Sequence, residues 1–293
     1  MSAPDTGVRS LRVLVGYDGS ASAVNAIEAA ATLLPSATAS ILNLWEPPFT
    51  SPELRHRVME RAANAEALGR LLETEGRAEA ERLAGNGVKL ARAAGWEAEA
   101  LVKRTFGGDG YQFARTAEEL DADLMVVGSR GTGGLRASMG SVSELVVHVS
   151  PVPVLVVPHP LTTVEWAAAA SGPVIVGTDG SPHAQRALAT ATTFFPHRHR
   201  LLVAVQEKED SPTPPPVEGT ELVTVRCSGR AGRPRATATT LADEAARRGA
   251  AVLVVGSRGR SSTRETLVGH VTRALLHSAH RPVLVVPAAR AAG

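Results

Sequence analysis

The chain has 293 residues, of which 44% are hydrophobic and 20% are charged, and its formal net charge is +2. This length allows two domains that each bury a core, the composition excludes a disordered chain, and the charge argues against nucleic acid as the partner. The single cysteine, Cys227, rules out an internal disulfide, and the sequence shows neither a signal core nor a membrane-spanning apolar run. We therefore expect a cytoplasmic protein with no membrane partner.

The first half opens with a β-branched strand, LRVLVG, which passes through Asp-Gly-Ser into an alanine-rich helix. A second strand ends near Leu44, and residues 63–95 predict one long helix with Gly95 as its C′ residue, although the glycines in AGNG weaken it. The apolar strand LMVVG then leads into a glycine-bearing loop, a further helix and the closing strand PVLVVP. Alternation of buried strands with helices predicts a doubly wound parallel sheet.

The second half repeats these elements with one interval shortened. Asp18 and Asp179 lie 161 residues apart, whereas Gly128 and Gly256 lie only 128 apart, so 33 residues are missing between the second and fourth strands. The segment that remains there, QEKEDSPTPPPVEG, is too rich in proline to form the missing helix. The sequence thus predicts an α/β protein with two tandem doubly wound parallel-sheet domains, the second lacking one crossover helix.

The predicted domain limits follow from this repeat. We place the first domain at residues 1–158, a linker at 159–172, where strand character lapses, and the second domain at 173–293. Since parallel sheets are normally covered on both faces, the missing helix should bare part of the second sheet. The first domain, the PTPPP segment or a second chain can cover it, and we expect a homodimer.

A glycine-bearing loop follows the fourth strand of each half, and a further glycine opens the next helix. At the carboxyl edge of a parallel sheet, such glycines let backbone N–H groups approach a phosphate, and the helix start adds partial positive charge. The alternative is structural, because Ser141 and Glu144 have the spacing of a capping box that holds the helix start without a ligand. The P-loop and Rossmann signatures are absent, since no lysine follows either loop and Arg136 stands where the third Rossmann glycine belongs.

An aspartate ends the first strand of each half, as Asp18 and Asp179. At that position of a doubly wound sheet a carboxylate can accept hydrogen bonds from ribose hydroxyls or a base amine. The alternative is an Asx turn or helix N-cap, shared with Ser20 or Ser181. The aspartates and the glycine loops fall on the same sheet edge, which favours a ligand site.

Together, VGYDGS and VGTDGS, the two VVGSRG turns, MGSVSELVVH and the closing PVLVVP strands resemble the universal stress protein family in a tandem two-domain form. The resemblance covers nearly the whole chain and implies five-stranded, adenine nucleotide alpha-hydrolase-like domains and, in one branch of the family, bound ATP or AMP. In the first half the implied nucleotide-binding residues are Gly16, Asp18, Leu44, Gly128, Ser129, Arg130, Gly131, Gly133, Gly134, Gly140, Ser141 and Val142. In the second half they are Gly177, Asp179, Val205, Gly256, Ser257, Arg258, Gly259, Gly269 and His270.

Both halves depart from the family pattern. The first has eight residues between Gly131 and Gly140 where the family has nine, and the second replaces the hydroxyl residue after Gly269 by His270. Arg273 also stands where the first half has a glutamate, and a cation in a helix's first turn opposes the dipole unless an anion or a carboxylate lies beside it. We expect the first half to bind nucleotide more tightly, whereas a protonated His270 would strengthen the second site at acid pH.

These patterns predict a sensor or regulator that binds ATP, ADP or AMP, with Mg²⁺ accompanying ATP, and that has no catalytic residues. The alternatives are a slow ATPase or nucleotidyl-transferring enzyme, and a nucleotide-free structural module. The sequence has neither an acidic pair that could bind magnesium nor a lysine in either glycine loop, and this argues against the enzyme. We expect no metal site at His270, His277 and His280, because no carboxylate or cysteine accompanies them in sequence.

Overall fold

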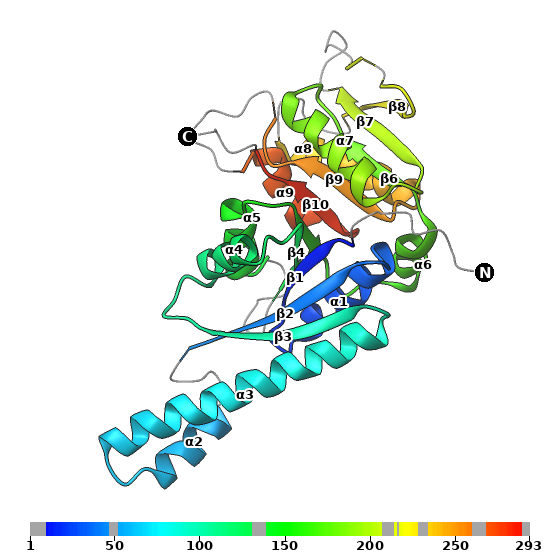
Figure 1. The fold of residues 1–293 in the computed structure, drawn as a ribbon. Coiled ribbons are helices and arrows are strands. Elements are labelled where there is room, and N and C mark those ends of the chain that lie inside the picture. Colours follow the sequence, from blue (N-terminus) through cyan, green and yellow to red (C-terminus); the bar gives the residue numbers. More distant parts are fainter. Residues whose placement is uncertain are drawn as a thin grey trace, which may run out of the picture.

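The computed structural model describes residues 10–46, 52–130, 139–206, 214–215, 217–227, 234–259 and 268–288. Within these residues, ten strands form one sheet that runs through the molecule (Figure 1). The first half supplies β1 (Arg12–Gly16), β2 (Thr38–Trp45), β3 (Glu97–Arg104), β4 (Leu124–Gly128) and β5 (Val154–Val157). The second half supplies β6 (Val174–Gly177), β7 (Arg200–Gln206), β8 (Glu221–Arg226), β9 (Val252–Gly256) and β10 (Val283–Val286).

Each half is a doubly wound parallel sheet, as predicted. The strand order is β3-β2-β1-β4-β5 in the first half and continues as β10-β9-β6-β7-β8 in the second. The strand pairs inside each half are parallel, whereas β5 and β10 pair antiparallel, with Leu155 opposite Leu284. The halves therefore join edge to edge with their strands pointing in opposite directions, an arrangement that the sequence did not predict.

Helices cover both faces of the sheet. They are α1 (Ala21–Leu33), α2 (Pro52–Arg61), α3 (Ala65–Ala93), α4 (Asp109–Glu119), α5 (Ser141–Val149), α6 (Thr163–Ser171), α7 (Pro182–Phe194), α8 (Pro234–Arg247) and α9 (His270–Ser278). Successive residues of β1 point to opposite faces. Val15 belongs to a hydrophobic cluster that includes residues of α1, α3 and α7, and Leu14 belongs to a second cluster that includes residues of α4, α5, α8 and α9. Both hydrophobic clusters contain residues of both halves, so the core continues across the join.

The missing crossover helix is confirmed. In the first half α2 and α3 lie between β2 and β3, whereas the described residues between β7 and β8 contain no helix. Leu202 of β7 is nevertheless buried, in the same cluster as Ala91 of α3. Pro214, in the PTPPP segment, is also buried. Which group covers the rest of this face stays a prediction.

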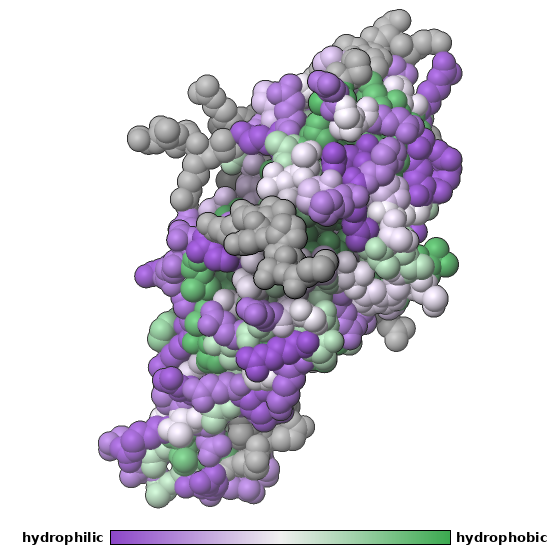
Figure 2. Space-filling model, turned by 45° about the vertical axis from the view of Figure 1, so that its right-hand side comes forward, coloured by the Kyte–Doolittle hydropathy of each residue, from purple (hydrophilic) through white to green (hydrophobic). Residues whose placement is uncertain are grey.

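The long helix α3 ends at the predicted residue, and the packing of one of its glycines, Gly87, accounts for the absence of a side chain there. Ala94 is its C-cap and Gly95 follows with φ of 95°, the left-handed conformation expected at C′. A Cβ on Gly87 would lie 2.6 Å from Ile41 Cγ2 and 3.0 Å from the Tyr17 ring, so this glycine lets the helix approach the sheet. The amino-terminal part of α3 projects from the sheet together with α2 (Figure 1), and Figure 2 shows many hydrophilic residues on this projecting end.

The predicted linker, residues 159–172, contains the helix α6. Its carboxyl end is held by Arg198, whose guanidinium donates to the carbonyls of Ala169 at 2.9 Å and Gly172 at 3.0 Å. Such bonds satisfy carbonyls that a helix end leaves without partners. Within the described residues, no helix has both the length and the apolar character needed to cross a membrane.

Candidate functional site

The first aspartate lies in the turn between β1 and α1, at the carboxyl edge of the sheet. Its Oδ1 accepts a hydrogen bond from the Ser20 N–H at 3.0 Å, and Ser20 Oγ caps α1 by accepting from Ala23 N–H at 3.2 Å. The Asx turn and the N-cap that we named as alternatives are therefore both formed. They fix the Asp18 carboxylate at this edge, and its charge, after burial, contributes to a raised pKa of Tyr17.

The second aspartate has the same arrangement and one further contact. Asp179 Oδ1 accepts from the Ser181 N–H at 2.9 Å, and Ser181 Oγ accepts from Ala184 N–H. The other carboxylate oxygen, Oδ2, lies 2.8 Å from the position that a Cβ on Gly259 would take. The fold thus brings Asp179 and the second VVGSRG turn together, and a side chain larger than glycine would collide there.

Each VVGSRG turn is closed onto the start of the following helix. Ser129 N–H donates to Val157 O at 2.8 Å, and Gly140 N–H donates to Ser129 O at 2.8 Å. Ser257 repeats this arrangement with Val286 and Gly269, at 2.7 and 2.6 Å. Glycines distant in sequence therefore meet at one place in each half. Gly131, Gly133 and Gly134 lie outside the described residues, so their predicted role is untested.

Several predicted glycines also have packing roles. A Cβ on Gly128 would lie 2.4 Å from Ser22 Oγ, and one on Gly256 would lie 2.9 Å from His183 Cβ. Gly16 and Gly177, at the ends of β1 and β6, would likewise collide with Phe113 of α4 and Leu241 of α8. Close approach of helix to strand is thus sufficient to explain these four glycines.

The helix starts differ from the capping-box alternative, which is wrong. Gly140 and Gly269 are the N-caps of α5 and α9, and neither start has a side-chain cap hydrogen bond. Ser141 is the first helical residue, so its hydroxyl is not placed as a cap, and Glu144 instead forms an ion pair with Arg273 at 2.8 Å. Helix starts without side-chain caps at the ends of glycine loops suit an anion.

The remaining predicted residues lie on the same edges. Leu44 and Val205 are near the carboxyl ends of β2 and β7, and Val142 is partly exposed in the first turn of α5. The side chain of Arg130 is turned to the end of β5, where Nη1 donates to His159 O at 2.7 Å. Arg258, its counterpart in the second half, has a buried Nε with no hydrogen-bond partner in the described part of the chain.

Three residues near these edges were missed by the sequence analysis. Phe106 follows β3 and is 80% exposed, with the Arg104 guanidinium 4.6 Å from its ring centre. His183 and Arg186 lie in the first turns of α7, with Arg186 Nη2 and His183 Nδ1 2.7 Å apart. The alignment of the two halves places Ser22 and Asn25 opposite the last two, a difference in charge that was the available signal.

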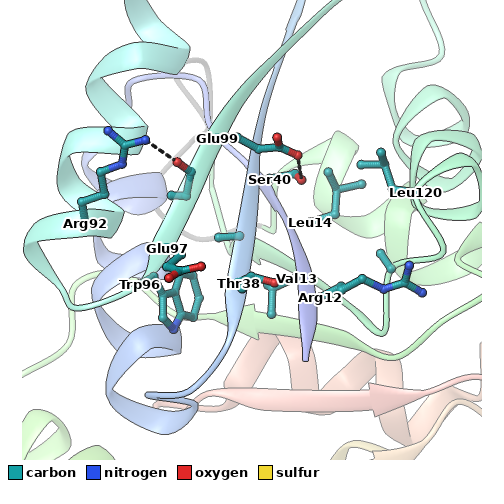
Figure 3. A pocket seen from close by; sticks show the side chains of 13 residues that line it. Arg12, Val13, Leu14, Thr38, Ser40, Arg92, Trp96, Glu97, Glu99 and Leu120 are labelled. Carbon is teal, nitrogen blue, oxygen red and sulfur yellow. Dashed lines mark hydrogen bonds between the residues drawn. The ribbon is translucent and has the colours of Figure 1, made fainter. Parts of the chain in front are cut away.

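Surface hollows of the described residues lie largely away from these sheet edges. One, of about 660 Å³, is at the amino ends of β1, β2 and β3 (Figure 3), and none of the predicted site residues lines it. Two of its polar side chains are bonded within the hollow, since Ser40 Oγ donates to Glu99 and Arg92 donates to Ala98 O. Another, of about 680 Å³, lies between α8 and α9 and includes His270 and His277. The described residues hold no metal-binding group of three His, Cys, Asp or Glu.

The fold and the site define a tandem α/β protein with one candidate anion edge in each half. The model of the universal stress protein family matches residues 10–158 and 216–287. A universal stress protein of Mycobacterium tuberculosis strain H37Rv is 30% identical over 308 residues, covering 93% of this chain and 96% of the relative. The chain belongs to the universal stress protein family.

A solved structure shares the fold over both halves. The crystal structure of a universal stress protein from Archaeoglobus fulgidus DSM 4304 superposes with a TM-score of 0.64 at 21% identity, covering 96% of this chain and 97% of that one. A universal stress protein solved in complex with cAMP is 25% identical and covers 51% of this chain and 97% of its own, with a TM-score of 0.36. The first of these covers both halves, which agrees with the tandem form predicted from the sequence.

Proposed function

We propose that the protein binds an adenine nucleotide, chiefly in its first half, and acts as a stress-response sensor or regulator without efficient turnover. The observation that carries this proposal is the hydrogen bond from Gly140 N–H to Ser129 O, which joins the end of β4 to the start of α5. It presents a helix start with no side-chain cap on the edge that also holds Asp18. Backbone N–H groups at such a start favour phosphate.

The base and ribose would lie across the neighbouring strand ends. Tyr17 N–H donates to Leu42 O, which continues the pairing of β1 and β2 and brings Asp18 level with Leu44. The Asp18 carboxylate would accept from ribose or the base amine, and the backbone at Leu44 would contact the base. With ATP, Mg²⁺ would enter bound to the phosphates, as is usual for this ion.

The rival functions are a slow ATPase or nucleotidyl-transferring enzyme and a nucleotide-free module. Mass spectrometry of nucleotide released from protein purified without added ligand tests the proposal, with ATP, ADP or AMP expected. Phosphate release is then measured beside an equilibrium titration with ATP. Turnover above about 1 s⁻¹ lies in the ordinary enzyme range and would favour the enzyme. Neither bound nucleotide nor saturable ATP binding would favour the module.

The assembly and location are further parts of this proposal. The antiparallel pairing of β5 and β10 already unites two such domains within one chain, leaving β3 and β8 as the outer strands. We propose that a homodimer covers the face of β7 and β8 for which the described residues provide no counterpart of α3. The cytoplasmic location and the domain limits at residues 158 and 173 remain predictions from the sequence.

A further inference from the structure

The carboxyl edge of the second half holds a cluster of cations beside the glycine turn. His183 and Arg186 lie on one side of α7, three residues apart, and their side chains touch at 2.7 Å. A Cβ on Gly256 would lie 2.9 Å from His183 Cβ, so the turn that carries Arg258 runs directly past His183. We call His183, Arg186 and Arg258 the cationic cluster.

Among the described residues, the charges that act on His183 are those of two arginines and one aspartate. Burial lowers the pKa of His183, and the positive charges of Arg186 and Arg258 lower it further, while Asp179 opposes them. The Nε atoms of both arginines are buried and have no hydrogen-bond partner among the described residues. A buried donor without a partner is costly, and a bound anion that accepts a hydrogen bond from it would offset that cost.

The first half lacks this cluster at the same places. Ser22 stands for His183 and its Oγ accepts from the Arg130 N–H at 3.2 Å. Asn25 stands for Arg186 and donates to Pro158 O at 3.4 Å. The guanidinium of Arg130 itself donates to a backbone carbonyl, that of His159. The positive charge is thus a property of the second half and not of the shared fold.

We propose that the cationic cluster binds an oxyanion of the phosphate class, with the guanidinium groups of Arg186 and Arg258 as its main donors. Guanidinium forks match the geometry of phosphate oxygens. Because Arg186 donates to Nδ1 of His183, the ring carries its proton on Nε2 and offers a further donor. The anion can be inorganic phosphate or the phosphate of a nucleotide. This inference depends on the proposed function only because the cluster lies at the carboxyl edge of the sheet, where the nucleotide is also proposed to bind.

The test uses the full chain and the residues of the first half as substitutions. Inorganic phosphate and ATP are titrated separately into the unaltered protein, into Arg186→Asn, and into the double variant His183→Ser, Arg186→Asn. We expect saturable phosphate binding that weakens at least about tenfold in both variants, since a hydrogen bond to a charged group contributes about 1.5–3 kcal/mol. Arg186→Lys keeps the positive charge but loses the planar pair of guanidinium donors, so its affinity for phosphate should lie between those of the unaltered protein and Arg186→Asn. Arg235→Asn, an exposed position on α8, is the control for net charge.

The two sources of the anion are separated in a Gly140→Glu background, which blocks the proposed nucleotide site of the first half. ATP binding that survives there and is lost with Arg186→Asn assigns a nucleotide phosphate to the cluster, and saturable binding of inorganic phosphate assigns the free anion. The proposal is overturned if neither is seen, or if Arg186→Asn binds as tightly as the unaltered protein. If the double variant does not fold by circular dichroism, Arg186→Asn alone decides. ATP binding in the first half is judged separately, by its loss with Gly140→Glu.

Discussion

At the scale of single residues, glycine has two distinct uses in this protein. Gly16, Gly128, Gly177 and Gly256 let helices approach strand ends, whereas Gly140 and Gly269 cap helix starts with backbone alone. The sequence pattern does not distinguish these uses, because both place a glycine at the carboxyl edge. The structure separates them by what a Cβ would meet.

Gly85 and Gly87 of α3 give a matched test of packing against helix propensity. A methyl group at Gly85 would meet nothing within 4 Å outside its own helix, so Gly85→Ala should stabilise the protein by up to about 1 kcal/mol. At Gly87 the methyl would press on Ile41 and Tyr17, and overpacking of about 1–3 kcal/mol should outweigh the gain in propensity. Chemical denaturation of the two variants measures this. Equal stabilisation by both would show that α3 does not press on the sheet.

Glu244 should make stability depend on pH. Its carboxylate is buried and accepts hydrogen bonds from Arg247 and Arg248, and the bond from Arg247 is the main cause of its lowered pKa. A carboxyl group whose pKa is lower in the folded than in the unfolded state stabilises the fold at any pH above its unfolded pKa, which is about 4.3 for glutamate. This stabilisation is lost as the pH falls through the pKa of the folded state. Glu244→Gln should therefore be clearly less stable at pH 7 and approach the unaltered protein below about pH 4. If the free energies of unfolding of Glu244→Gln and the unaltered protein differ by the same amount from pH 7 to pH 3, this expectation is contradicted.

At the scale of elements, the join between the halves explains the unusual start of α9. Arg273 opposes the dipole of its own helix, and Glu144 of α5, in the other half, lies 2.8 Å from its guanidinium. The glutamate that the sequence assigned to a capping box thus serves the neighbouring helix. One residue of shift in the cap position, from Ser141 to Gly140, made the difference.

A double-mutant cycle on Glu144 and Arg273 measures this contact. Arg273 is 59% exposed, so the coupling should be modest, about 0.2–1 kcal/mol, and should shrink as salt is added. In a Glu144→Gln background, Arg273→Gln should be neutral or stabilising because it removes an uncompensated cation from the first turns of α9. If the changes in the free energy of unfolding caused by the two single substitutions add up to that of the double variant at low salt, the ion pair is not formed in solution.

At the scale of the whole molecule, the sequence predicted what each half contains but not how the halves meet. Strand periodicity, the repeat and the 33-residue gap were enough for two parallel sheets and the missing helix. Closing strands with the same sequence, PVLVVP, gave no sign that β5 and β10 would pair with each other. The cationic cluster was also missed, because His183 and Arg186 have the pattern of an ordinary helix surface in the sequence and only the fold brings them beside the turn that carries Arg258.

The missing helix leads to a prediction about assembly. Light scattering should give twice the mass of the chain, because part of the face of β7 and β8 lacks the helix that α3 provides in the first half. The isolated second half, residues 173–293, should self-associate, since it exposes the edge of β10 as well. A monomeric full chain together with a soluble, monomeric second half would contradict both expectations.

The central claim is that adenine nucleotide binds mainly in the first half. The most direct measurement is an equilibrium titration with ATP, at neutral pH, of the unaltered protein and of two matched variants, Gly140→Glu and Gly269→Glu. Each places a carboxylate at the start of one helix, where it repels phosphate. We expect Gly140→Glu to lose most of the binding and Gly269→Glu to keep it. The account is contradicted if Gly269→Glu loses the binding while Gly140→Glu retains it.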